Sequence, residues 1–333
     1  MTSAVKNYIH KVAIVGATGN SGSYMVEALL ATGKHTVTAI SRMESTATVP
    51  DGVKVAKVDY ADSATLVAAL TGQDALVMTM NVMAPSDSEA KLITAAADAG
   101  VKWILPNDWS PDIADEVLSK EIFIGEAKRA NRELIAKLGK SAYVAVECGF
   151  WYEWSLAMGA GYGFDLAGRK VTMYDDGETK ICTSTLPQVG RAVANILSLK
   201  VAPDGPDDTT PCLEMLRNKF VYVSSFTVSQ RDILASAMRV SGTSLADWDI
   251  TYEPSTTRYA RSVAEIQSGS RAGFVKQLYT RVFFQDGKGN VEKTKGLHNK
   301  ILGLPTDEDI DVFTKIAFER QLTLDKIGMN LPA

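Results

Sequence analysis

The sequence has few of the residues that mark several classes of protein. Only three cysteines occur in 333 residues, Cys148, Cys182 and Cys212, and they form no C-x-x-C pair. This scarcity predicts a reducing compartment and argues against a disulfide framework or a structural zinc site. The formal net charge of −4 provides no basic surface, so we expect no nucleic-acid partner.

Long apolar runs are also missing. No stretch approaches the ~18 consecutive apolar residues of a membrane span, and the first residues lack the apolar run of a signal peptide. We therefore expect a cytoplasmic protein without a membrane partner. His10, His35 and His298 show no metal-ligand spacing, and the nucleophile-elbow pattern G-x-S-x-G is absent.

The most informative stretch covers residues 12–42. The apolar run VAIV is followed by Gly16, Gly19 and Gly22 at spacings of three, by an amphipathic helical pattern, and by a second apolar strand over 36–40. Glycines at such a turn permit a sharp reversal, a close approach of the backbone to a pyrophosphate, and tight packing of helix on strand. Amide groups at the helix start would face the phosphates. This pattern predicts a dinucleotide-binding turn of the G-x-x-G-x-x-G type.

Strands and helices alternate beyond this turn. Strands are predicted over 53–58, 75–80, 101–105 and 141–147, and helices over 63–70, 86–99 and 122–137. Alternation of this kind predicts an α/β fold with a doubly wound parallel sheet of the Rossmann type and right-handed crossovers. A second, smaller α+β domain should follow. We expect residues 1–150 to form the NADP-binding domain, with 187–241 returning to it, and 151–186 and 242–333 to form the substrate-binding domain. Residues 170–181 predict a strand pair around a turn at 175–177.

Ligands of such sheets bind at the carboxyl ends of the strands. The candidate cofactor contacts are therefore the residues of the glycine turn and of the strand ends: Gly16, Thr18, Gly19, Asn20, Ser21, Gly22, Ser41, Arg42, Asp59, Tyr60, Thr79, Met80, Asn81, Pro106, Asn107, Cys148 and Phe150. Arg42 favours NADPH, because a guanidinium suits a 2′-phosphate whereas NAD sites usually carry an acid there. The alternative is a solvated Arg42 neutralised by Glu44. Asp59 could bind adenine or, like Ser63, cap the next helix.

The Tyr-x-x-x-Lys pair of conventional short-chain dehydrogenases occurs nowhere in the chain. The predicted helix 122–137 instead places Lys128, Arg132 and Ile135 on one face, and composition alone would make this helix a solvated surface. The motif GATGNSG, Arg42, the missing tyrosine and the spacing of Phe123, Lys128, Arg132 and Ile135 together resemble the NmrA-like/isoflavone reductase-like family of atypical short-chain dehydrogenases/reductases. The segments QVGRAVANIL and FVYVSSFTVSQRDIL resemble its fungal members.

That resemblance implies a role for Lys128, because a lysine at the matching helix position is catalytic in the plant reductases of the family. Lys128 would also contact the cofactor. The resemblance further implies NADPH-dependent reduction of a small apolar, aromatic molecule and a place in secondary metabolism. The chain departs from the plant pattern at residues 106–109 and in the segment CGFWYEW, so the plant substrates are not carried over. A homodimer is one assembly that we consider.

Six aromatic residues lie within positions 150–164. Aromatic walls suit a planar apolar ligand, so the candidate substrate contacts are Asp108, Trp109, Trp151, Tyr152, Trp154 and Tyr162. The alternative is that these aromatics form the core between two domains. Glu153 and Asp165 are interpreted as surface charges.

These observations lead to one main hypothesis and two rivals. The main one is an NADPH-dependent reductase that passes a hydride from nicotinamide C4 to its substrate, with Lys128 as general acid/base or as stabiliser of an oxyanion. The rivals are a non-catalytic NADP(H)-sensing regulator of the NmrA-like kind and a cofactor-dependent isomerase.

Overall fold

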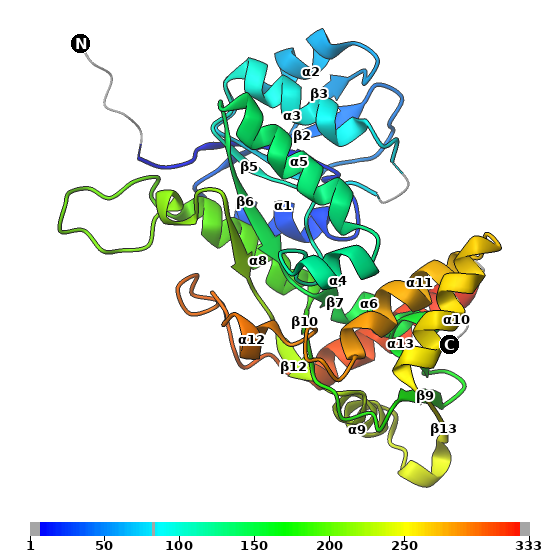
Figure 1. The fold of residues 1–333 in the computed structure, drawn as a ribbon. Helices are drawn as coiled ribbons and strands as arrows, with labels where there is room; N and C mark the ends of the chain where they lie inside the picture. Colours follow the sequence, from blue (N-terminus) through cyan, green and yellow to red (C-terminus); the bar gives the residue numbers. More distant parts are fainter. Residues whose placement is uncertain (1–6, 82–83, 327–333) are drawn as a thin grey trace, which may run out of the picture.

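A parallel seven-stranded sheet is the centre of the structure, a computed structural model that describes residues 7–81 and 84–326 (Figure 1). Its strands lie in the order β11 (Lys219–Tyr222), β6 (Ala142–Glu147), β5 (Trp103–Leu105), β4 (Ala75–Met78), β1 (Lys11–Val15), β2 (Thr36–Arg42) and β3 (Lys54–Val58). All neighbouring pairs are parallel. The strand order reverses between β1 and β4, and ligands of such sheets bind at this point. The predicted α/β Rossmann-type fold is confirmed.

Helices cover both faces of the sheet. Helices α1 (Gly22–Ala31) and α8 (Leu186–Ser198) lie on one face, and α2 (Ser63–Leu70), α3 (Ser88–Ala99) and α5 (Gly125–Leu138) on the other (Figure 1). Side chains of a strand point alternately to the two faces. In β1, Val12 and Ile14 accordingly pack in the α1/α8 core, and Ala13 and Val15 pack in the α2/α3/α5 core.

Two local expectations are corrected by the backbone. The helix predicted over 122–137 begins only at Gly125, because Phe123 has a φ of 61° and the short helix α4 (Glu116–Glu121) precedes it. Helix α2 is capped by Asp62, whose side chain accepts from the Ala64 N–H at 3.0 Å. The Asp59 carboxylate accepts instead from the Ala61 N–H at 2.8 Å, so it closes the turn before the helix.

A second apolar core lies below the sheet, beside two three-stranded sheets, β12-β10-β7 and β13-β9-β8. The elements in this part of the molecule are β7 (Phe150–Trp151), α6 (Tyr152–Ala157), α7 (Gly159–Tyr162), β8 (Phe164–Asp165), β9 (Lys170–Tyr174), β10 (Ile181–Ser184), β12 (Phe226–Val228), α9 (Gln230–Ser241), β13 (Asp249–Glu253), α10 (Ser255–Gln267), α11 (Arg271–Thr280), α12 (Val291–Thr294) and α13 (Ile310–Lys326). The 187–241 segment is shared between the two cores. Helix α8 packs on α1 and β11 joins the large sheet, whereas α9 packs on α13 and β12.

The strand pair predicted over 170–181 is wrong. Both strands exist, but β9 pairs with β8 and β13, and β10 pairs with β7 and β12. The turn between them bonds to other elements, since the Asp175 N–H donates to the Glu253 carbonyl at 2.9 Å and Arg231 Nε donates to the Asp176 carbonyl at 2.8 Å. The turn is thus bonded to elements distant in the sequence, and the two strands that it connects belong to different sheets.

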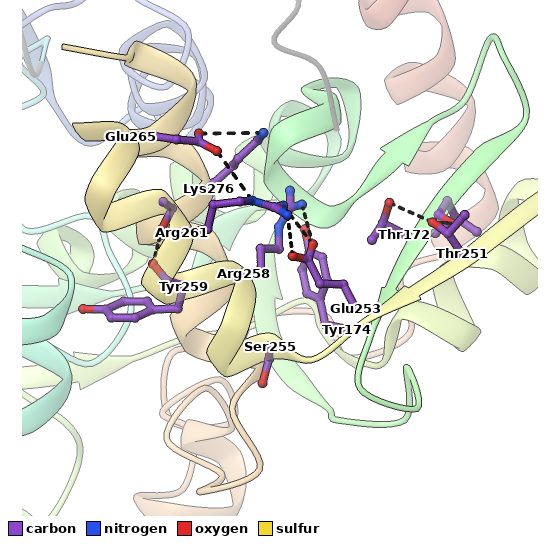
Figure 2. A network of polar contacts seen from close by, with 12 residues as sticks. Thr172, Tyr174, Thr251, Glu253, Ser255, Arg258, Tyr259, Arg261, Glu265 and Lys276 are labelled. Atoms are coloured by element: carbon purple, nitrogen blue, oxygen red, sulfur yellow. Dashed lines mark hydrogen bonds and ion pairs between the residues drawn. The ribbon is translucent and has the colours of Figure 1, made fainter. Parts of the chain in front are cut away.

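A charged network joins α10 and α11 to the end of β13 (Figure 2). The Arg258 side chain is only 1 % exposed; its guanidinium lies 4.9 Å from the Tyr174 ring centroid and 3.5 Å from the Glu253 carboxylate. Arg261 approaches the same carboxylate at 2.8 Å but is half exposed. Glu253 is therefore the counter-ion of a buried guanidinium.

We expect Glu253→Gln to destabilise the protein by about 3 kcal/mol, because it leaves the buried Arg258 without a counter-ion. The matched variant Arg261→Ala removes an exposed partner of the same carboxylate and should cost less than about 1 kcal/mol. Chemical denaturation at neutral pH measures both. Equal losses in the two variants would contradict the assignment of Glu253 to Arg258.

Candidate functional site

The glycine turn after β1 has no room for side chains at two of its three glycines. Gly16 has a φ of 80°, and a Cβ there would lie 2.0 Å from the Thr79 carbonyl oxygen. A Cβ on Gly22 would lie 2.1 Å from the Gly16 carbonyl oxygen. The Thr79 hydroxyl donates to the carbonyls of Val15 and Gly16 at 3.1 and 3.3 Å. The turn is thus held against the end of β4.

The start of α1 is suited to a phosphate group. Thr18, Gly19 and Asn20 are exposed, and the side chain of Ser21 makes no capping hydrogen bond. The first amide groups of the helix therefore have no side-chain acceptor at the Ncap, where an anion is favoured by the helix dipole. A backbone cradle that a Cβ would fill, next to such a helix start, fits a dinucleotide.

Two cations lie at the carboxyl end of β2. Arg42 is exposed and forms an ion pair with Glu44 at 3.3 Å. Lys57, which pairs with Ser41 across β2 and β3, donates from Nζ to the carbonyls of Arg42 and Ser45. Tyr60 is close by: burial raises the pKa of its phenol, and the positive charge of Arg42 opposes that rise. Lys57 was not predicted as a cofactor contact from the sequence. Its position beside Ser41 arises from the pairing of β2 with β3, which the sequence alone does not show.

Asn107 connects the end of β4 to Lys128. Its side-chain amide exchanges two hydrogen bonds with the backbone of Met80, at 3.1 and 3.2 Å, and donates to Glu89 at 2.9 Å. Its backbone carbonyl accepts from Lys128 Nζ. Lys128 is half-buried. The structure therefore brings together Met80, Asn107 and Lys128, which the sequence placed in three separate segments.

Asp108 lies in a buried ion pair. Its carboxylate accepts from the Arg132 guanidinium, and the two side chains are 1 % and 7 % exposed. Burial raises the pKa of Asp108, while the charges of Lys128 and Arg132 oppose the rise. Arg132 also lies 4.8 Å from the Phe220 ring centroid. Asp108 is thus engaged by Arg132 and is withdrawn as a direct substrate contact.

Glu147, the last residue of β6, is the acid that sequence analysis missed. It is 1 % exposed and lies on the sheet beside the segment that carries Asp108. Burial raises its pKa well above the ordinary value, and the charges of Asp108 and Asp112 add to the rise. The neighbouring Cys148 is fully buried, which raises the pKa of its thiol to about 12. The signal in the sequence was a single acid at the end of an otherwise uncharged strand.

The aromatic segment divides into core and partly exposed residues. Tyr152 and Tyr162 are fully buried, with their hydroxyls bonded to Thr314 and Thr183 at 2.7 and 2.8 Å. They belong to the second apolar core and are withdrawn as direct substrate contacts. Phe150 is 8 % exposed and stacks on Tyr279 at 4.0 Å.

Three tryptophans keep part of their surface accessible. Trp151 and Trp154 are half-buried, and the Arg320 guanidinium lies 5.1 Å from the Trp154 ring centroid. Trp109 is also half-buried and donates from Nε1 to the Met78 carbonyl at 2.8 Å, so it lies at the carboxyl end of β4. Glu153, expected at the surface, is 1 % exposed and accepts from the Leu186 N–H at 2.9 Å.

A cavity of about 330 Å³ lies between α4, α5 and the β6–β11 edge of the sheet. Its lining includes Ser119, Arg132, Tyr143 and Phe220, and none of the residues predicted to contact the cofactor. Arg132 thus both lines this cavity and pairs with Asp108.

Two kinds of feature are absent from the residues that the structure describes. Among the helices of residues 7–81 and 84–326, none is both long and apolar enough to cross a membrane. Within the described part of the chain, no group of three or more histidine, cysteine, aspartate or glutamate side chains is arranged to hold a metal ion.

The turn and the sheet define the class of protein to which these features belong. Residues 16–121 match the profile of a family described as NAD(P)H-binding. That match includes the glycine turn and the ends of β2, β3, β4 and β5. The predicted cofactor class is therefore confirmed as NAD(P)H.

Over nearly its full length the chain is similar to the oxidoreductase aprR of Aspergillus flavus, with 26% identity over 312 residues that cover 92% of this chain and 98% of the relative. A solved structure of isoflavone reductase matches with a TM-score of 0.70 and 21% identity, and the match covers 93% of this chain and 99% of that one. The structure of AtPrR2 with NADP+ and (+)pinoresinol matches with a TM-score of 0.69 and 18% identity, and it covers the same shares of the two chains. These neighbours confirm the fold and the predicted likeness to isoflavone reductase, and the comparisons support an NAD(P)H-binding oxidoreductase.

We expect Arg132→Met to destabilise the protein by about 3–5 kcal/mol at neutral pH, because it leaves the Asp108 carboxylate buried and unpaired. The deficit should shrink as the pH falls, since a protonated Asp108 needs no counter-ion. Arg129→Met, an exposed change on the same helix, should stay within about 0.5 kcal/mol. Denaturation of both variants over a pH series measures this, and a pH-independent deficit would argue against the ion pair.

Proposed function

We propose that the protein is an NADPH-dependent reductase of a small apolar, aromatic molecule, in which Lys128 donates the proton or stabilises the oxyanion. One observation supports this most directly. Lys128 Nζ is bonded to the Asn107 carbonyl, and Asn107 is bonded to Met80 at the end of the strand that holds the glycine turn. The amine and the dinucleotide turn are thus linked through consecutive residues of one strand end, Thr79 and Met80.

The residues present fit the cofactor. The amides of Gly19 to Gly22 would hold the pyrophosphate, and Arg42 with Lys57 would hold the 2′-phosphate. When bound, the nicotinamide supplies a hydride. The Lys128 ammonium would supply the proton to the reduced oxygen, or offset its developing charge. Its fixed position at the Asn107 carbonyl keeps it oriented between turnovers.

The proposed substrate class rests on the aromatic residues that follow β5 and β6 in the sequence. Trp109, Trp151 and Trp154 have accessible surface, and Phe150 stacks on Tyr279. Aromatic walls with few charges favour a planar apolar ligand. The bound pinoresinol of the structural neighbour is an aromatic molecule, which supports the same class.

The rival reading, a regulator that senses NADP(H), is less well supported, because the full-length relative is an oxidoreductase. An isomerase would use the same residues without net loss of NADPH. Screening quinones, enones and aryl ethers for substrate-dependent NADPH oxidation separates the three. The proposal would be contradicted if the folded protein binds NADPH but none of these compounds causes NADPH to be oxidised.

We expect Arg42→Ala to weaken NADPH binding by about 10–100-fold, since hydrogen bonds to charged groups contribute about 1.5–3 kcal/mol. NADH binding should change little, because it has no 2′-phosphate. Titration calorimetry with both cofactors makes the comparison. Glu44→Ala is the matched control, and it should bind NADPH at least as tightly because it frees Arg42 from its ion pair. A parallel loss for NADH would refute a 2′-phosphate role.

We expect Lys128→Ala to lower kcat by ~10²–10⁴-fold while the Kd for NADPH is nearly kept. Lys137→Ala, an exposed change at the end of the same helix, should leave kcat unchanged. Steady-state kinetics with the substrate found by screening measures both. Full turnover in Lys128→Ala would remove this residue from the mechanism.

A further inference from the structure

One carboxylate joins two segments that meet at Lys128. Glu89 lies in the first turn of α3, and its Oε1 accepts from the side-chain amide of Asn107, after β5, at 2.9 Å. Its Oε2 accepts from the side-chain amide of Asn131 on α5 at 2.6 Å. The side chains of all three residues are half-buried. This carboxylate bridge therefore connects α3, the segment after β5, and α5.

The Asn107 end of the carboxylate bridge lies where the Lys128 side chain ends, since the Asn107 carbonyl accepts from Lys128 Nζ. The Asn107 side-chain amide exchanges two hydrogen bonds with the backbone of Met80. Its NH₂ group has two donors, so one donates to Met80 and the other to Glu89. Asn107 is therefore held by the end of β4 and by α3, and its carbonyl is a fixed acceptor for the ammonium group.

The Asn131 end of the carboxylate bridge lies near the place where the Lys128 side chain begins. Both residues belong to α5, and residues three apart on a helix are neighbours on its surface. Lysine has a flexible four-carbon stem, so the position of its amine depends on the helix that carries it and on the acceptor that it meets. Glu89 is bonded next to both.

A carboxylate suits this position because both of its partners are donors. Asn107 and Asn131 each present an NH₂ group, and an ionised carboxylate has acceptors only. A negative charge is also favoured in the first turn of a helix. Glutamine has nearly the same shape, but its own NH₂ group would face the donor of one asparagine. Glu89→Gln therefore breaks one bond of the carboxylate bridge with little change in volume.

We propose that Glu89 is a positioning residue for Lys128: by bonding Asn107 and Asn131 at once, it fixes the helix that carries the lysine and the carbonyl that holds its amine. The catalytic meaning of this inference rests on the proposed function. A reacting group that is misplaced by about 1 Å can lower a rate by about 10²-fold. The carboxylate bridge therefore matters for turnover although Glu89 itself has no part in the chemical step.

The placement of the amine is tested without turnover. Wild type and Glu89→Gln are treated with acetic anhydride at one pH, and the acetylation of each lysine is followed by mass spectrometry. Lys128 should react about 2–10-fold faster in the variant, the factor that corresponds to the loss of one hydrogen bond. The rate of Lys137, which is exposed at the end of α5, should stay the same in both samples. An unchanged Lys128 rate would overturn the proposal.

Two further variants separate the carboxylate bridge from a simple effect of charge. Asn131→Ala breaks the bridge from α5 without changing any charge, and it should raise the Lys128 rate by a similar factor. It also provides the test if Glu89→Gln does not fold. Asp98→Asn removes an exposed acid from α3 and should leave the rate unchanged. A faster Lys128 in Glu89→Gln but not in Asn131→Ala would show an effect of charge alone and would overturn the proposal.

The catalytic consequence is tested by a double-mutant cycle. Glu89→Gln should lower kcat by about 10–100-fold, while the Kd for NADPH is nearly kept. In a Lys128→Ala background the same change should cost little more, because the effects of residues that act as a unit are not additive. A full additional loss in that background would show that Glu89 acts independently of Lys128 and would overturn the proposal. A protein that passes the acetylation tests yet reduces no substrate would refute the proposed function and still support the placement of Lys128 by Glu89.

Discussion

The buried ion pair between Asp108 and Arg132 is the interaction on which the candidate site depends. It fixes α5 over the carboxyl ends of β5 and β6, and it does so one helical turn after Lys128. Because Arg132 is engaged by Asp108, the neighbouring Glu147 has no cation within hydrogen-bond distance. The pair therefore holds α5, and with it Lys128, against the segment that carries Asn107 and Asp108.

The glycine turn is connected to this pair through the end of β4. Thr79 bonds to the turn, Met80 bonds to Asn107, and Asn107 accepts from Lys128. The first two bonds join segments that are adjacent because β1, β4 and β5 are neighbours in the sheet, and the third joins the segment after β5 to α5. The strand order thus explains how residues 16, 79, 107 and 128 form one site.

Much of the nucleotide-binding half was predictable from the sequence, because its signals are local. Glycine spacing and apolar runs identified the turn, and helical spacing placed Lys128 and Arg132 on one face. The predictions that were wrong concern residues whose structure depends on partners far away in the sequence. Strand β9, in the segment 170–181, pairs with residues 79 positions away, and no periodicity in the sequence indicates this. Tyr152 and Tyr162 look like pocket residues by type, yet buried hydroxyl partners on other elements place them in the core.

Glu147 illustrates the same limit for chemistry. Its strand was predicted, but its burial depends on β11 lying outside β6, and the Arg132 guanidinium is paired with Asp108. Neither can be read from residues 141–147 alone. The fold and the family likeness were therefore accessible to sequence reasoning, whereas the electrostatic arrangement around Lys128 required the structure.

A crystal structure of the protein with NADPH tests the central claim most directly. The account predicts the pyrophosphate against the amides of Gly19 to Gly22, with the Lys128 amine facing the nicotinamide end of the cofactor. A cofactor bound away from this turn, or a Lys128 amine directed into bulk solvent away from the nicotinamide, would contradict it.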